Sequence, residues 1–130
     1  MKRILVVDDS PTIRRMVRAS LARSLPAAQF LEAGSGLEAI ERLAVGAVSL
    51  IVLDLNMPDM HGLEVLNFVR SHQKYRHVPI IVLTTRSDEA SRTAALGAGA
   101  SAYLTKPFTP EALGNEARRL FSGGDMSASA

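Results

Sequence analysis

The chain has 130 residues, of which 47% are hydrophobic and 22% charged, and it contains no cysteine. This composition is typical of one globular domain with its own core, and it excludes disulfide bonds and thiol catalysis. A formal net charge of +2 does not by itself argue for nucleic-acid binding, and no apolar run approaches the roughly 18 residues of a membrane-spanning helix.

Five short apolar runs, separated by helical patterns, are the candidate strands. They cover residues 3–7, 29–32, 50–53, 79–83 and 102–104. Residues 4–7, 50–53 and 80–83 are apolar at every position, which is typical of strands buried on both faces of a parallel sheet.

Helix start signals fill the gaps between these runs. Ser10 and Pro11 predict an N-cap followed by proline at the first helical position, and Ser35 with Glu38 fits a capping box. The three later helices are expected to begin near Gly62, after a cap at Ser87, and after Thr109.

Five βα units in this order predict an α/β fold. We expect a doubly wound, flavodoxin-like (βα)5 sheet with parallel strands in the order 2-1-3-4-5, counted along the chain, and five helices on its two faces. Residues 1–121 would form the domain, and residues 122–130 a flexible tail or the start of a linker. Gly114 lies inside the last helical pattern, where glycine costs about 1 kcal/mol relative to alanine, and the sequence offers no reason for it.

Polar residues follow the predicted strands at their carboxyl ends. They are Asp8 and Asp9 after the first strand, Asp54 after the third, Thr84 after the fourth and Lys106 after the fifth. In an open parallel sheet these ends meet at one edge, where ligands bind.

Each of these residues has an ordinary explanation when taken alone. An aspartate after a strand is commonly a turn former, Thr84 suits a strand, and a single lysine is usually solvated. Together they indicate chemistry, because three neighbouring carboxylates repel one another and raise each other's pKa. A hard divalent cation and a lysine would relieve that repulsion, and Mg²⁺ prefers such oxygen ligands.

These residues and their neighbours resemble the receiver domain of two-component response regulators, in particular the single-domain, chemotaxis-regulator-like members. The matching segments are Val7-Asp8-Asp9, residues 54–62 (Asp-Leu-Asn-Met-Pro-Asp-Met-His-Gly), Leu83-Thr84 and residues 103–108 (Tyr-Leu-Thr-Lys-Pro-Phe). The resemblance covers about residues 2–121, and each motif follows the appropriate predicted strand.

The resemblance implies a phosphoacceptor and a metal site. Asp54 would take a phosphoryl group from a phosphohistidine of a sensor histidine kinase or a histidine phosphotransfer protein. Asp9, Asp54 and the backbone carbonyl of Asn56 would bind Mg²⁺ directly, and Asp8 would act through a bound water. Lys106 would pair with Asp54 at rest and with a phosphoryl oxygen afterwards.

The resemblance also implies a switch. The Thr84 hydroxyl and the backbone N–H groups of Asn56 and Thr85 would contact the phosphoryl oxygens. Thr84 would move inward and the Tyr103 ring would follow, changing the face made by the fourth helix, fifth strand and fifth helix, which binds a downstream target protein. The alternative for Tyr103 is a half-buried strand aromatic with its hydroxyl in water. The peptide before Pro107 is usually cis in this family.

Three features depart from the family pattern or leave a property open. Thr85 stands where the family usually has a smaller residue, so we expect slower phosphoryl uptake from small donors than for Thr85→Ala. Asn56 and Arg86 occupy positions that tune hydrolysis of the phosphoaspartate. The arginines of the first helix either help to dock the phosphodonor protein or form an ordinary solvated face.

The expected function is a stand-alone signalling switch in the cytoplasm, without membrane insertion or direct DNA binding. Its own chemistry would be limited to phosphotransfer and autodephosphorylation, so we do not expect an enzyme in the usual sense. The alternatives are the receiver part of a longer regulator, a degenerate scaffold, and a Mg²⁺-dependent phosphohydrolase. That last class typically carries Asp-x-Asp after its first strand, whereas the candidate nucleophile here follows the third.

Overall fold

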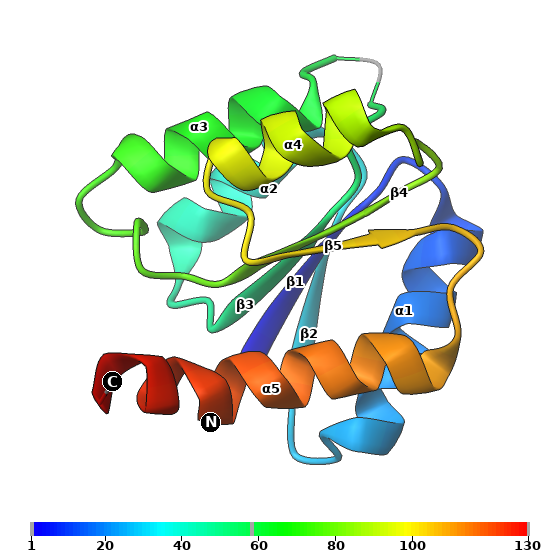
Figure 1. Cartoon of the computed structure of the whole chain (residues 1–130), viewed down its shortest axis with the longest axis vertical. Coiled ribbons are helices and arrows are strands. Elements are labelled where there is room, and N and C mark those ends of the chain that lie inside the picture. Colours follow the sequence, from blue (N-terminus) through cyan, green and yellow to red (C-terminus); the bar gives the residue numbers. More distant parts are fainter. Residues whose placement is uncertain (1, 58, 130) are drawn as a thin grey trace.

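The computed structural model in Figure 1 describes residues 2–57 and 59–129, with side chains up to Ser122. In these residues five strands alternate with five helices. The strands are β1 (Arg3–Val7), β2 (Gln29–Ala33), β3 (Leu50–Leu53), β4 (Ile80–Thr84) and β5 (Ala102–Thr105). The helices are α1 (Pro11–Ser24), α2 (Gly36–Val45), α3 (Gly62–Ser71), α4 (Glu89–Gly97) and α5 (Pro110–Ser129).

The strands form one parallel sheet in the order β2-β1-β3-β4-β5, which confirms the predicted doubly wound α/β fold. Helices α1 and α5 cover one face of the sheet, and α2, α3 and α4 cover the other (Figure 1). The strand order reverses beside β1, so β1 and β3 are neighbours although α1, β2 and α2 separate them in sequence. This reversal creates the crevice in which ligands of such sheets bind.

The core has one apolar layer on each face of the sheet. Every residue of β3 and β4 is buried, and successive side chains point to opposite faces. Leu5 and Ile51 therefore pack beneath α2, α3 and α4, whereas Ile4 and Leu50 pack beneath α1 and α5. This two-sided burial explains why the strand sequences are continuously apolar.

Strands β2, β4 and β5 each end one residue later than predicted, and β4 also begins one residue later. The additional residues pair with neighbouring strands: Ala33 with Val7, and Thr84 with Thr105. Sequence patterning locates such ends poorly, because pairing with a partner strand, rather than the hydrophobic run, determines where a strand stops.

The predicted helix starts are confirmed for α1, α3 and α5. The Ser10 hydroxyl accepts a hydrogen bond from the Ile13 N–H at 3.2 Å, and the Thr109 hydroxyl accepts one from the Ala112 N–H at 3.0 Å. The predicted cap at Ser87 is wrong. The N-cap of α4 is Asp88, whose carboxylate accepts the Ser91 N–H at 2.9 Å. Aspartate caps as well as serine, and its charge is also favourable at a helix N-terminus.

Half of the capping box predicted for α2 is present. The Ser35 hydroxyl accepts the Glu38 N–H at 3.1 Å. The Glu38 carboxylate, however, accepts the N–H of Gly34 at 2.6 Å, one residue before the N-cap that it would contact in a standard box.

Gly114 is explained by the close approach of α5 to α1. A Cβ atom at this position would overlap the hydroxyl oxygen of Ser24 and would lie 3.1 Å from its Cβ. Glycine therefore allows the two helices to pack, which offsets its low helix propensity.

The expected tail, residues 122–130, falls largely outside the residues whose side chains are described. Helix α5 has bounds that reach Ser129, and the domain boundary at residue 121 stays a prediction. In the described part of the chain, no helix combines the length and the hydropathy that crossing a membrane requires.

Candidate phosphoryl-acceptor and metal site

Three carboxylates meet at the carboxyl edge of the sheet. Val7 of β1 pairs with Leu53 of β3, so the residues that follow, Asp8 and Asp54, lie side by side, and the Asp54 N–H donates to the Val7 carbonyl at 3.0 Å. Asp8 and Asp54 are buried, whereas Asp9 is exposed. One oxygen from each of the three carboxylates lies within 4.8 Å of the others, as the sequence predicted.

Lys106 brings the positive charge to these carboxylates. Its Nζ lies 2.7 Å from Asp8 Oδ2 and 3.7 Å from Asp54 Oδ2. Lys106 therefore lies within ion-pair distance of Asp54, as the expected resting contact requires, but its hydrogen bond goes to Asp8. The peptide bond between Lys106 and Pro107 is cis.

Asp54 is in an environment that disfavours its charged form. Burial raises the pKa of this carboxyl, and the charges of Asp8 and Asp9 act in the same direction. The Lys106 ammonium and the Asn56 N–H, which donates to Asp54 Oδ1 at 3.2 Å, lower the pKa but do not cancel the rise. The protein groups around Asp54 therefore do not fully stabilise its ionised form, and a bound cation would do so.

Asp8 has protein donors on both carboxylate oxygens. The Ser10 N–H donates to Oδ1 at 2.9 Å, and Lys106 donates to Oδ2. The backbone carbonyl of Asp8 accepts a further hydrogen bond from the Arg14 guanidinium at 2.6 Å. Asp9, by contrast, is exposed next to the hydrogen-bonded Asp8, so a cation can reach it from solvent.

Thr84 and Asn56 are linked through Arg86. The fully buried Thr84 accepts the Arg86 N–H on its hydroxyl at 3.3 Å. The Arg86 guanidinium donates to the Asn56 side-chain carbonyl at 2.9 Å, and the Asn56 amide is 3.5 Å from the Thr85 hydroxyl. The loops after β3 and β4 are thus joined across the site.

Tyr103 is buried, and its hydroxyl donates to the Arg86 carbonyl at 2.6 Å. The alternative with the hydroxyl in water is therefore wrong for this conformation. Burial raises the pKa of Tyr103, with a smaller contribution in the same direction from Asp88. The ring connects β5 to the loop that follows Thr84 at the end of β4, which brings together the two residues that the sequence assigned to the switch.

Two contacts near the site were missed by the sequence interpretation. Asp59, in the loop after β3, accepts the N–H groups of Gly36 and Leu37, each at 3.2 Å, and so caps α2. Burial opposes ionisation of this carboxyl, but these N–H groups hold the pKa of Asp59 below its usual range. Arg14, which donates to the Asp8 carbonyl and to Glu32, was interpreted only as one of several arginines on the first helix. No sequence signal joins Asp59 or Arg14 to these partners.

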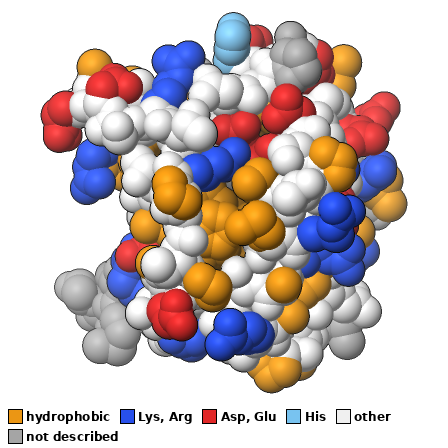
Figure 2. All heavy atoms as spheres, turned by 90° about the vertical axis from the view of Figure 1, so that its right-hand side faces the viewer, with side chains coloured by type: hydrophobic (Ala, Val, Ile, Leu, Met, Phe, Trp, Pro, Cys, Tyr) orange, Lys and Arg blue, Asp and Glu red, His pale blue; other side chains and the backbone are white. Residues whose placement is uncertain are grey.

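An apolar pocket of about 300 Å³ opens beside the carboxylates. It is lined by Ile13, Met16, Thr85, Lys106, Pro107 and Phe108. The face in Figure 2 shows hydrophobic side chains gathered in its middle, with acidic and basic groups around them. Lys106 and Thr85 thus belong both to the polar site and to an apolar surface next to it.

Comparison with known proteins agrees with this geometry. The family model of the response regulator receiver domain matches residues 4–118. The chain is 43% identical to the chemotaxis protein CheY1 of Helicobacter pylori over 112 residues, which cover 85% of this chain and 90% of that protein. The structure of the Vibrio cholerae chemotaxis response regulator CheY4 matches with a TM-score of 0.84 and 34% identity, over 92% of this chain and 98% of that one.

A second solved structure is that of a metal-bound relative. The Mn²⁺-bound form of the response regulator Rcp1 matches with a TM-score of 0.78 and 29% identity, over 93% of this chain and 94% of that one. Fold, site geometry and sequence similarity lead to one conclusion: the chain belongs to the family of response regulator receiver domains, and it is of the CheY type.

Proposed function

We propose that this receiver domain accepts a phosphoryl group on Asp54 from a sensor histidine kinase or a histidine phosphotransfer protein. CheY-type receiver domains are signalling proteins rather than classical enzymes. The observation that carries the proposal is the position of the Asp54 carboxylate, grouped with Asp8 and Asp9 and 3.7 Å from Lys106 Nζ. A buried carboxylate beside other acids is unfavourable unless a cation binds there. Groups perturbed in this way cluster at functional sites.

The donor set fits Mg²⁺, because it consists of carboxylate oxygens close enough to share one ion. Asp9 and Asp54, with the Asn56 carbonyl, would hold the ion. Asp8 would contact it through water, since both of its carboxylate oxygens already accept hydrogen bonds from the protein. The bound ion would neutralise charge on the phosphoryl oxygens. The Mn²⁺-bound relative Rcp1 supports a divalent cation in this family.

The side chains of the site supply the rest of the chemistry. An Asp54 oxygen forms a bond to phosphorus while the bond from phosphorus to the donor's histidine nitrogen breaks, and the imidazole leaves with that electron pair. Lys106, the Thr84 hydroxyl and the N–H groups of Asn56 and Thr85 would bind the phosphoryl oxygens. They act by position and charge, which is how most phosphoryl transfer is accelerated.

The output of the switch follows from the link between Thr84, Arg86 and Tyr103. The phosphoryl group would draw the Thr84 hydroxyl away from the Arg86 N–H, and the Arg86 carbonyl would shift with its hydrogen-bonded Tyr103. A population shift of this loop and ring would change the face of α4, β5 and α5, which we propose as the surface for the downstream target protein.

The apolar pocket supports contact with the phosphodonor protein. Met16, on its rim, is 48% exposed, although a methionine normally packs inside. A protein that covered this pocket would bring its phosphohistidine next to Lys106 and Asp54. We therefore favour docking over a purely solvated face for the part of α1 that carries Ile13 and Met16.

Amide NMR with Mg²⁺ and beryllofluoride, a phosphoryl mimic, tests the function. In wild type we expect shifts at the site and also at Tyr103 and along α4, whereas Asp54→Asn should show none of them with the mimic. Shifts that remain at the carboxyl edge of the sheet would contradict the switch. A response of Asp54→Asn equal to wild type would contradict the phosphoacceptor.

Thr85 offers a second test of the site. Its side chain stands beside the expected phosphoryl position and lines the pocket. Thr85→Ala should therefore take up phosphoryl groups from acetyl phosphate faster than wild type, because a methyl and a hydroxyl group are removed from the approach. Equal rates, measured by phosphorylated fraction against time, would show that Thr85 does not restrict access.

A further inference from the structure

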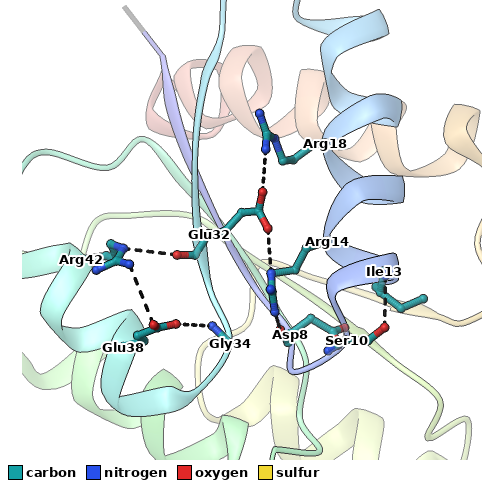
Figure 3. A network of polar contacts seen from close by, with 9 residues as sticks. All are labelled: Asp8, Ser10, Ile13, Arg14, Arg18, Glu32, Gly34, Glu38 and Arg42. Atoms are coloured by element: carbon teal, nitrogen blue, oxygen red, sulfur yellow. Dashed lines mark hydrogen bonds and ion pairs between the residues drawn. The ribbon is translucent and has the colours of Figure 1, made fainter.

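Arg14 bridges β2 and the loop that carries the acidic pair. Figure 3 shows its guanidinium lying between Glu32 on β2 and the backbone of Asp8. Arg14 Nε donates to Glu32 Oε1 at 2.7 Å, and a terminal nitrogen of the same guanidinium donates to the Asp8 carbonyl at 2.6 Å. The side chain is only 17% exposed, so both hydrogen bonds are largely shielded from water.

Arg18 makes half of this arrangement. It donates to the other Glu32 oxygen at 2.6 Å but is 47% exposed. Its guanidinium also lies over the Phe30 ring, 5.7 Å from the ring centre. The Arg14 hydrogen bond, ahead of a smaller contribution from Arg18, keeps the pKa of Glu32 below its usual range, so Glu32 is ionised at neutral pH. The two arginines thus carry equal charge on one helix face and share Glu32, but Arg14 alone of the pair contacts Asp8.

A hydrogen bond to the Asp8 carbonyl constrains the peptide unit that joins Asp8 to Asp9. A peptide unit is planar, so the direction of the Asp8 carbonyl fixes the plane that leads to the Asp9 Cα. The Asp8 N–H donates to the Ala33 carbonyl at 3.1 Å, and the Asp8 carboxylate accepts the Ser10 N–H. With Arg14 on the carbonyl, the peptide units on both sides of Asp8 have fixed orientations.

We propose that Arg14 is a positioning residue of the metal site: anchored by Glu32, it holds the Asp8–Asp9 peptide in the orientation from which both carboxylates address one cation. This inference rests on the proposed Mg²⁺ site. It assigns to one arginine of α1 a role inside the site, separate from partner docking, although Arg14 itself does not touch the ion.

The sign of the effect distinguishes positioning from simple electrostatics. A nearby positive charge repels Mg²⁺, so removal of an arginine that acts only by its charge should tighten Mg²⁺ binding. Removal of a group that positions the ligands should weaken Mg²⁺ binding. The loop would then have to become ordered when the ion binds, and the loss of conformational entropy opposes binding. Groups that hold metal ligands in place typically contribute tenfold or more to affinity.

Mg²⁺ titration calorimetry of four proteins tests the proposal. Relative to wild type, Arg14→Ala should bind Mg²⁺ about tenfold more weakly, at the low end for groups that support metal ligands. Arg14→Lys should also bind more weakly although it keeps the charge, since one ammonium lacks the guanidinium fork that reaches both partners. Arg18→Ala, the matched control, should bind equally well or slightly more tightly.

Metal-free measurements guard against a purely structural effect. Melting temperatures of Arg14→Ala and Arg18→Ala report the stability that each arginine contributes. Amide NMR of the metal-free proteins should show shifts at Asp9 and Ser10 for Arg14→Ala that Arg18→Ala lacks. If Arg14→Ala does not fold, Arg14→Lys decides the question through the same titration.

The outcomes separate this inference from the proposed function. Wild-type protein that binds no Mg²⁺ would overturn the metal site itself. Wild-type binding together with unchanged or tighter binding by Arg14→Ala and Arg14→Lys would overturn the positioning role and leave the site intact. Equally weakened Mg²⁺ binding in Arg14→Ala and Arg18→Ala would assign the effect to Glu32 or to general stability. That result would also overturn the positioning role.

Discussion

Replacing Asp54 with asparagine should stabilise the metal-free protein. Asparagine has nearly the same shape and keeps an oxygen for the Asn56 N–H, which lies 3.2 Å from Asp54 Oδ1. It removes a buried negative charge from beside two other acids. The change therefore destroys the proposed chemistry and at the same time relieves the folded state of an unfavourable charge.

The magnitude follows from the distances in the site. At an effective dielectric constant of about 20, two unit charges 4.8 Å apart repel by about 3.5 kcal/mol, and this spacing is the upper limit for the three carboxylates. The Lys106 ammonium, 3.7 Å from Asp54 Oδ2, attracts by about 4.5 kcal/mol. Two repulsive partners thus outweigh one attractive partner. Because water screens the exposed Asp9, we expect Asp54→Asn to gain about 1–2 kcal/mol.

Urea denaturation at neutral pH, with metal removed by a chelator, measures this gain. Saturating Mg²⁺ should reverse the order, because a ligand at one hundred times its Kd adds about 2.7 kcal/mol to a protein that binds it, and Asp54→Asn lacks a negative charge that would hold the ion. Asp88→Asn, at an exposed helix cap, is the control and should show neither effect, since asparagine caps equally well.

The gain should also depend on pH. The pKa of Asp54 is raised in the folded protein, so wild type loses stability relative to Asp54→Asn as pH rises through that pKa. Each unit of the rise corresponds to about 1.4 kcal/mol, and the gap should close at acidic pH, where Asp54 is protonated in both the folded and unfolded chains. A metal-free Asp54→Asn protein that is no more stable than wild type at neutral pH would refute this reasoning.

Two further changes test the packing around the site, and a third tests the contact between α1 and α5. Gly62→Ala should unfold or strongly destabilise the protein, because its Cβ would lie 2.6 Å from the Leu55 Cα; a melting temperature close to wild type would contradict that packing. Tyr103→Phe should lose about 1 kcal/mol in urea denaturation, since its hydroxyl donates to the Arg86 carbonyl, and an unchanged midpoint would place that hydroxyl in water. Gly114→Ala should destabilise although alanine favours helices, and less so in a Ser24→Ala background; stabilisation in the wild-type background would refute the close helix contact.

The arrangement of the acidic groups could be read from local sequence. Continuously apolar runs identify strands buried on both faces, and parallel strands bring their carboxyl ends to one edge whatever the details of packing. Asp8, Asp54 and Lys106 therefore had to meet, and the family motifs fixed which strand carries each. Caps at Ser10 and Thr109 were equally local, because each contact spans only a few residues.

Other contacts depended on partners far apart in the chain. Asp59 caps α2 from more than 20 residues away, and Lys106 selects Asp8 over Asp54 for its hydrogen bond across 98 residues. Gly114 makes sense only once α5 lies against Ser24. Sequence periodicity describes one element at a time, so it carries no information on which side chains meet across elements.

The chain by itself therefore determined the fold, the edge of the sheet that is used and the acidic residues found there. Tertiary structure decided how those residues are held: Arg14 on the Asp8 carbonyl, Tyr103 on the Arg86 carbonyl and the raised pKa of Asp54. The physical reason is that backbone carbonyls look alike in any sequence. Only packing decides which carbonyl a distant guanidinium or hydroxyl reaches, and how much water a carboxylate loses.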